Sequence, residues 1–305
     1  MAISDYLPLS KEEIQPFMER SDFEGFKMVL WIWGSTAAVF ALVVMFPYWY
    51  VYVAVVFLFA GRMQGIAAMM HEVGHYTLFE TKKYNEFVRD WLSSPFIFMD
   101  GKAYSKFHML HHKNAGTKND PDLENYKNYP ITKMSFLRKC IRDFSGWTGL
   151  KLIAYWLLTG KDAVSKEKRA PFTLTKGVLM NGLIFAALWF VGAPEVFALW
   201  ILSHFTVYMF IVRFRQISEH GGVQDIYAMD PKYNTRSVPQ GILGFLFFSP
   251  TSGLSYHCEH HAFMAVPSYH LKGLHEKLKE KGYYDDIQLH SGYLGVFKDI
   301  FIKSA

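Results

Sequence analysis

Four long apolar runs divide the chain into alternating apolar and polar segments. They cover residues 28–46, 49–64, 172–191 and 196–214. Each is close to the ~20 residues that a helix needs to cross the hydrocarbon core of a bilayer, and each is longer than most buried helices of soluble proteins. The pattern therefore predicts four transmembrane helices.

The short interruptions between these runs predict two hairpins. Pro47 separates the first two runs, and the tetrapeptide 192–195 separates the last two. We expect an all-α integral membrane protein with a single domain over residues 1–305. Its transmembrane hairpins should lie at about 28–66 and 172–214, and the rest of the chain should form a helical cap.

The positions of the basic residues predict the orientation of the hairpins. No Lys or Arg lies in either hairpin turn, whereas both are frequent elsewhere in the polar segments. Because cytoplasmic loops carry an excess of Lys and Arg, we expect both termini and the cap to be cytoplasmic, in segments 1–27, 67–171 and 215–305. The net charge of +5 follows from this topology, and no basic stripe with interleaved aromatics indicates nucleic-acid binding. The polar N-terminus differs from the basic start and short apolar stretch of a cleaved signal peptide, so we expect it to be retained. The expected location is a bacterial inner membrane.

Two further segments are each open to two interpretations. Between the hairpins, apolar residues and cations recur at helical spacing, which is typical of an amphipathic helix in the membrane interface or of a helix packed inside the cap. The apolar members are Phe136, Leu137, Cys140, Ile141, Phe144, Trp147 and Trp156, and the cations are Lys133, Arg138, Lys139 and Arg142. Segment 238–254 is too short and too rich in glycine to span the bilayer, so we expect it to dip into the membrane or to line a substrate channel.

Eight of the thirteen histidines fall in three clusters. The clusters are His71-Glu72-Val73-Gly74-His75, His108-Met109-Leu110-His111-His112 and His257-Cys258-Glu259-His260-His261. Helix positions i, i+3 and i+4 share one face, so each cluster can direct two or three imidazoles at one point. Imidazole binds iron, zinc, copper and nickel, and eight imidazoles exceed what one tetrahedral zinc ion uses. The pattern predicts two metal ions near a membrane boundary.

A count of depth along the helices selects a ninth candidate ligand. From Pro194, ~20 residues of helix end near Arg213, which places His220 about two turns beyond the membrane and beside the clusters. With His220, each metal ion would have four or five imidazoles. The rival residue His204 lies ~24 Å back along a continuous helix, so we expect it to make a structural hydrogen bond instead.

Acidic residues near these histidines are candidates for orienting them, because a ligand histidine usually donates its other ring N–H to a carboxylate or a carbonyl. We assign this role to Glu72, Glu219 and Glu259, with Asp90, Asp120 and Asp122 at longer range. A solvated face is an equal alternative for each acid taken singly. The remaining histidines His270, His275 and His290 are expected on the surface.

The motifs HEVGH, HMLHH and HCEHH, with two hydrophobic hairpins between them, resemble the membrane-bound fatty acid desaturase family of non-haem di-iron enzymes. The third motif begins with His257, whereas family members fused to a haem domain tend to begin theirs with Gln. The resemblance implies two iron ions as cofactor, dioxygen as co-substrate and a fatty acyl or similar lipid chain as substrate. Related enzymes recruit an extra histidine upstream of the third cluster, which supports His220 without fixing it.

The resemblance also implies a separate electron carrier, either a small haem protein or a ferredoxin with its reductase. The chain has no nucleotide-binding glycine fingerprint after a strand, so reductant must come from outside. The cations near the second cluster are candidates for docking this carrier or an anionic head group of the substrate, although positive-inside bias explains them equally well. They are Lys102, Lys106, Lys113 and Lys118.

Desaturation is the favoured reaction, and lipid hydroxylation, decarboxylation and carotenoid or sterol oxidation are alternatives because relatives share the histidine pattern. A membrane zinc protease is a distant alternative, because HEVGH also satisfies H-E-x-x-H with Glu72 as general base. It leaves the six other clustered histidines unexplained. A non-catalytic metal carrier ranks last, because a transport site should line the membrane interior.

Small residues on the second span leave room for a substrate channel or serve helix packing, and they are Gly61, Gly65, Ala67 and Ala68.

Overall fold

The structure is a computed structural model that describes residues 7–161, 168, 170, 172–239, 241–248 and 251–302. Within these residues the fold is helical, and β pairing is limited to two isolated bridges. The helices of this part that are long and apolar enough to cross a membrane are α2 (Asp22–Met45), α3 (Trp49–Gly74), α9 (Thr173–Phe190), and α10 (Val196–Phe205) together with α11 (Val207–His220). The predicted all-α membrane fold with four spanning helices is confirmed.

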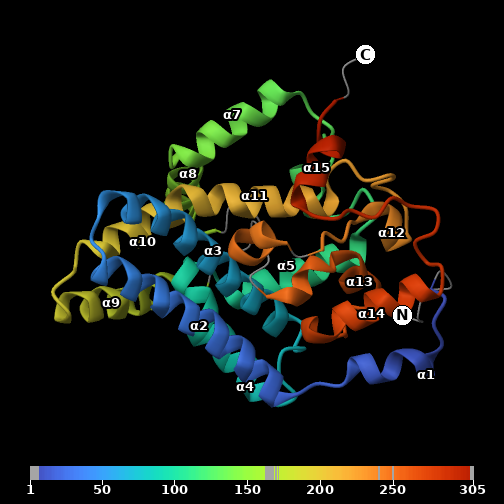
Figure 1. The fold of residues 1–305 in the computed structure, drawn as a ribbon, viewed down its shortest axis with the longest axis horizontal. Helices are drawn as coiled ribbons and strands as arrows, with labels where there is room; N and C mark the ends of the chain where they lie inside the picture. The colour runs from blue at the N-terminus through green and yellow to red at the C-terminus, as the bar shows by residue number, and fades with distance from the viewer. Residues whose placement is uncertain are drawn as a thin grey trace.

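The remaining helices connect and cover these four. In chain order they are α1 (Lys11–Ile14), α4 (Lys82–Phe87), α5 (Gly101–Asn114), α6 (Leu123–Tyr126), α7 (Lys133–Phe144), α8 (Trp147–Thr159), α12 (Pro231–Asn234), α13 (His257–Ala262), α14 (Ser268–Glu280) and α15 (Tyr293–Ile300). Short 3₁₀ helices are η1 (Gln15–Met18), η3 (Ser94–Ile97) and η5 (Ser252–Ser255). Short π-helices are η2 (Val88–Ser93) and η4 (Gly244–Phe248). Figure 1 shows α12 to α15 at the end of the molecule away from the two hairpin turns.

Helix α3 is the centre of the bundle. In its most apolar stretch 72% of the residues are buried inside the protein, against 17% for α2 and for α9. It packs against α2, α10 and α11. Helices α2 and α9 instead expose large apolar side chains, including Leu30, Leu183 and Phe190. An apolar surface of this extent indicates contact with lipid.

Helices α3 and α11 continue beyond the apolar runs that predicted them. Helix α3 ends at Gly74 and α11 at His220, eight and six residues past the expected ends of the hairpins at 66 and 214. The α10–α11 span is interrupted at Thr206, whose hydroxyl donates to the Leu202 carbonyl. A helix continues through polar residues as long as its backbone hydrogen bonds are made. The apolar runs therefore predicted the parts of the helices that span the membrane, but not where the helices end. The histidines therefore sit on the ends of rigid spanning helices.

The glycine-rich segment around η4 packs against the middle of α3. A Cβ atom at Gly61 would lie 2.0 Å from the Leu246 carbonyl oxygen, so only glycine allows this backbone approach. The buried Arg62 guanidinium donates to Ser35 Oγ and to the carbonyls of Phe245 and Leu246. These donors satisfy the carbonyls of irregular backbone beside the middle of α3, as non-helical backbone between spanning helices requires. Of the two predictions for this segment, its position supports insertion at membrane depth.

Candidate metal centre

Nine histidines converge in two adjacent groups near the ends of α3, α5, α11 and α13. The larger group is His71, His75, His108, His112 and His260, and the smaller is His111, His220, His257 and His261. Within each group the candidate ligand nitrogens all lie within 4.8 Å of one another. The second and third sequence clusters each contribute to both groups. These are the nine histidines that the sequence predicted, in sets of five and four, and their role as ligands stays a prediction.

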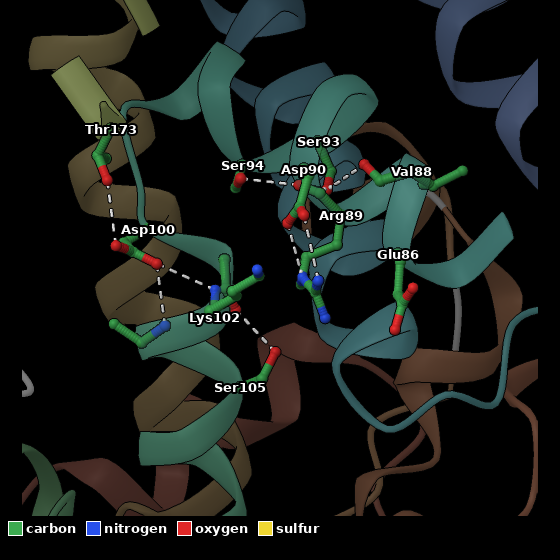
Figure 2. A network of polar contacts seen from close by, with 12 residues as sticks. Glu86, Val88, Arg89, Asp90, Ser93, Ser94, Asp100, Lys102, Ser105 and Thr173 are labelled. Atoms are coloured by element: carbon green, nitrogen blue, oxygen red, sulfur yellow. Dashed lines mark hydrogen bonds and ion pairs between the residues drawn. The ribbon is translucent and has the colours of Figure 1, made fainter. Parts of the chain in front are cut away.

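Helix α5 carries the second cluster, and its first turn is fixed from two sides. The Asp100 carboxylate caps the helix by accepting from the backbone N–H groups of Lys102 and Ala103. It also accepts from Thr173 Oγ1 at the start of α9, as Figure 2 shows. A Cβ atom at Gly101 would lie 2.6 Å from Arg89 Cγ, so the close packing of this turn requires glycine. The three histidines of α5 are thereby presented from an anchored helix.

The other ligand candidates occupy short or terminal helical positions. His71 lies in the last turn of α3, and His75 is the residue that caps its end. His220 is the last residue of α11. The third cluster forms the first five residues of the short helix α13. Within each cluster the i, i+4 pair belongs to one group, whereas His111 and His260, the i+3 members of the second and third clusters, belong to the other group.

Several ring nitrogens in the two groups are buried without a hydrogen-bond partner, which is the observation that fits metal binding. Nε2 of His71, His75, His260 and His261 is in this state. Other pairs face each other closely, with 3.0 Å between the Nε2 atoms of His108 and His112. Buried polar atoms are normally satisfied, and a divalent ion satisfies several convergent nitrogens at once.

Burial keeps most of these imidazoles in the form that binds metal. Burial lowers the pKa of His108, His112, His257, His260 and His261 well below the ordinary histidine value, so each is neutral near pH 7. Neutral imidazole is the ligand form of histidine.

His111 is the exception, because it is paired with a carboxylate. Burial alone would lower the pKa of His111, but its hydrogen bond to Asp120 and the charges of Asp122 and Asp120 outweigh burial and raise the pKa. His111 Nδ1 lies 2.8 Å from Asp120 Oδ1. Tyr126 donates its hydroxyl to the other Asp120 oxygen, and its ring stacks on His220 at 4.8 Å. Asp120 therefore orients one ligand candidate directly and a second through Tyr126.

The three predicted orienting glutamates behave differently. Glu72 Oε1 lies 3.1 Å from Nδ1 of His71, and its other oxygen accepts from the Ser268 backbone N–H at 2.9 Å. Glu219 Oε1 lies 3.7 Å from Nδ1 of His257, too far for a hydrogen bond.

Glu259 is fully buried and points away from its neighbouring histidines. It accepts from Ser237 Oγ and Tyr284 OH, and it lies 2.5 Å from Nδ1 of His275. The prediction that His275 lies on the surface is wrong, because it shares the buried face of α14 with Leu271 and Leu278. No spacing rule pointed to Ser237, His275 or Tyr284, because their proximity to Glu259 arises only from tertiary packing.

His204 lies outside both histidine groups. It is buried in α10, where its ring contacts Phe98 and Tyr208. The hydrogen bond predicted for it is not made at Nδ1, which is buried without a partner. The count along the helix correctly separated His204 from the clusters and brought His220 to them.

A cavity of about 320 Å³ opens beside the histidines, on the side of α5, α8 and α11. His71, His108, His111, His220 and His257 form its inner wall. The apolar lining comes from Ala67, Met70, Met99, Phe107, Leu152, Met209 and Val212 among others. Of the small residues considered for a channel, Ala67 lines this cavity, whereas Gly61 packs against Leu246. Its volume and lining suit an apolar ligand whose reactive part faces the imidazoles.

A helical membrane protein with two imidazole groups beside an apolar cavity has the architecture of a membrane-bound metalloenzyme. A profile described as fatty acid desaturase matches residues 47–293, which is most of the chain. The protein therefore belongs to the fatty acid desaturase family, whose members are oxidoreductases that act on fatty acyl chains with metal-dependent chemistry. A comparison of the sequence with curated proteins found no match.

Proposed function

We propose that this protein is an iron- and dioxygen-dependent desaturase of a fatty acyl or similar lipid chain, with the nine histidines as ligands of two iron ions. The observation that carries the proposal is the contact between both histidine groups and one apolar cavity. Bound iron would supply the oxidation of unactivated C–H bonds by dioxygen, which no side chain provides.

The protein's own residues bind and orient the substrate. Met70, Phe107 and Val212 offer apolar contacts that hold an extended acyl segment along the cavity and exclude water from it. Asp120 and Glu72 hold their histidines in one tautomer and orientation. A fixed site matters because a displacement of about 1 Å can cost ~100-fold in rate.

The overall reaction requires an external source of electrons. Two hydrogens leave the acyl chain, a carrier supplies two electrons, two protons come from solvent, and dioxygen becomes two water molecules. We propose that a separate carrier, a small haem protein or a ferredoxin, docks on the outer face of α5. That face exposes Lys102, Met109, Leu110 and Lys113, on the side of the helix opposite its histidines. A basic rim around an apolar centre suits an acidic carrier.

The proposed topology places both termini and the histidine groups in the cytoplasm. The lack of Lys and Arg in both hairpin turns supports it. A reporter fused at Ala193 should be exposed on the side opposite to reporters at either terminus. Opposite results for the two termini would contradict an even number of spans.

The zinc protease alternative is disfavoured by the environment of Glu72. Its carboxylate contacts His71 and accepts from Ser268 and Thr77, so it is not free to act as the general base on a water molecule. His71 and His75 also lie in a group of five imidazoles, whereas catalytic zinc uses three protein ligands.

Metal analysis combined with labelled dioxygen tests the proposal. Purified protein should contain about two irons per chain, since imidazole sites suit iron oxidation chemistry. Given a lipid substrate and reductant, it should form an alkene without retaining heavy oxygen. Heavy oxygen as the main fate in the organic product would favour the hydroxylase alternative. A single zinc ion, with activity indifferent to His260→Ala, would overturn the proposal.

A further inference from the structure

Helix α7 has three distinct faces along its length. Phe136, Cys140 and Asp143 face the protein, where Phe136 packs against Phe214 and Asp143 is fully buried. A second stripe, which we call the apolar stripe, is exposed and consists of Met134, Leu137, Ile141 and Phe144. Spacings of three, four and three residues place these four side chains on one side of the helix.

The third face of α7 is basic. Arg138 and Arg142 are exposed one helical turn apart, along one edge of the apolar stripe. Every exposed ionisable side chain of α7 is a cation, because its single acid, Asp143, is buried. An apolar stripe bordered by arginines matches the boundary between lipid tails and anionic headgroups.

The apolar surface continues from α7 into α8 and the spanning helices. Trp147 and Leu150 are exposed on α8, and Leu158 is 85% exposed. Helix α8 packs against α10, and α7 packs against α11 (Figure 1). The α7–α8 hairpin is therefore joined to the α10–α11 span, which is long and apolar enough to cross a membrane.

An ion pair with the buried carboxylate of Asp143 fixes this hairpin to the spanning bundle. The Arg213 guanidinium of α11 donates to both oxygens of Asp143, at 2.6 and 2.9 Å. Thr148 Oγ1 donates to the same carboxylate at 2.6 Å. Arg213 and Thr148 also line the cavity beside the histidines, so the same contacts link α7 to the cavity wall.

We propose that α7 lies in the headgroup layer of the bilayer, with its apolar stripe in lipid and Arg138 and Arg142 bound to anionic phospholipid headgroups. The proposal concerns the attachment of the hairpin and does not depend on the reaction. Of the two interpretations that the sequence left open for this segment, the proposal selects the amphipathic helix in the membrane interface and not the helix packed inside the cap. The occupant of the exposed face is the lipid surface, because the stripe continues into the spanning helices and its charged edge is uniformly basic.

Site-directed spin labelling in nanodiscs tests this contact without an activity measurement. Labels on one introduced cysteine at a time, at Leu137 or Ile141 in a Cys140→Ser background whose other cysteine, Cys258, is buried, are compared with a lipid control at Leu183 of α9 and an aqueous control at Lys272 of α14. Collisions with dioxygen report lipid, and collisions with a soluble nickel chelate report water. In discs that contain phosphatidylglycerol, the labels at 137 and 141 should behave like the Leu183 label.

The anionic part of the proposal is tested with Arg138→Gln and Arg142→Gln. Each lost cation should raise by about fivefold the phosphatidylglycerol fraction needed for half of the lipid contact, measured against phosphatidylcholine discs. The Leu183 label should not change, which shows that the fold is intact. Equal contact in both lipids would overturn anionic recognition. Labels at 137 and 141 that are open to the nickel chelate, or shielded from both reagents by protein, would overturn the membrane contact itself.

Discussion

Asp120 Oδ1 lies 2.8 Å from Nδ1 of His111, which is nine residues earlier in the chain. This contact fixes which ring nitrogen of His111 faces the other members of the smaller histidine group. Asp120→Asn replaces the charged acceptor with an amide and should lower iron affinity and turnover about 10- to 100-fold. Iron content after dialysis against a chelator measures the first effect. The exposed Glu124→Gln is the matched control and should retain both, and an Asp120→Asn protein with normal iron retention would show that this contact is only structural.

His220 and His204 differ in position, and their replacement should differ in effect. His220→Ala removes one of four imidazoles from the smaller group and should abolish turnover with a loss of iron. His204→Gln lies outside both groups and should keep its iron. Iron analysis of both purified variants checks the prediction, and the reverse result would mean that the α10–α11 span is misplaced.

The spanning helices and the eight clustered histidines were predictable because apolar length and helical spacing are local properties of the chain, and His220 followed from a count of depth along its helix. The division of the histidines between two groups was not predictable, because His111 and His112 are adjacent in sequence and separate only through the orientation of α5 against α3 and α13. His275 was misjudged for a similar reason. The lysine-rich sequence around it suggested solvent, but its hydrogen-bond partner Glu259 belongs to another helix.

Acid should destabilise the protein when it is free of metal. The pKa values of His108, His112, His257, His260 and His261 are lowered by burial, so unfolding allows these residues to take up protons below the ordinary value of ~6.5. Their contribution to stability is present above that pH and is lost as the pH falls toward the lowered values. His111, with its raised pKa, opposes the trend. Thermal unfolding of chelator-treated protein between pH 8 and 5 measures the effect, and a melting temperature that rises on acidification would contradict it.

Reversing two charges on the outer face of α5 should slow electron supply without disturbing the histidines. In the Lys102→Glu/Lys113→Glu variant, an acidic carrier should associate more slowly, and the difference should shrink at high salt. Stopped-flow reduction by the carrier checks this, with iron content as the measure of an intact site. Lys279→Glu on α14 is the control for net charge alone. Equal slowing in the control would place the carrier elsewhere.

Ala67 lies on α3 where the cavity meets the histidines, so its size should set how the acyl chain passes the reactive site. Ala67→Leu adds three carbons to the lining of the cavity, and a chain that no longer fits is displaced from the imidazoles. A displacement of about 1 Å can cost ~100-fold in rate, so the longest substrates should lose most activity and the new double bond should move along the chain. Gly182→Leu is the control, because a Cβ atom there meets nothing within 4 Å. Products from acyl chains of increasing length, analysed by mass spectrometry with iron content measured in parallel, check the prediction. Unchanged chain-length preference in Ala67→Leu would show that the substrate does not use this cavity, while leaving the two histidine groups as they are.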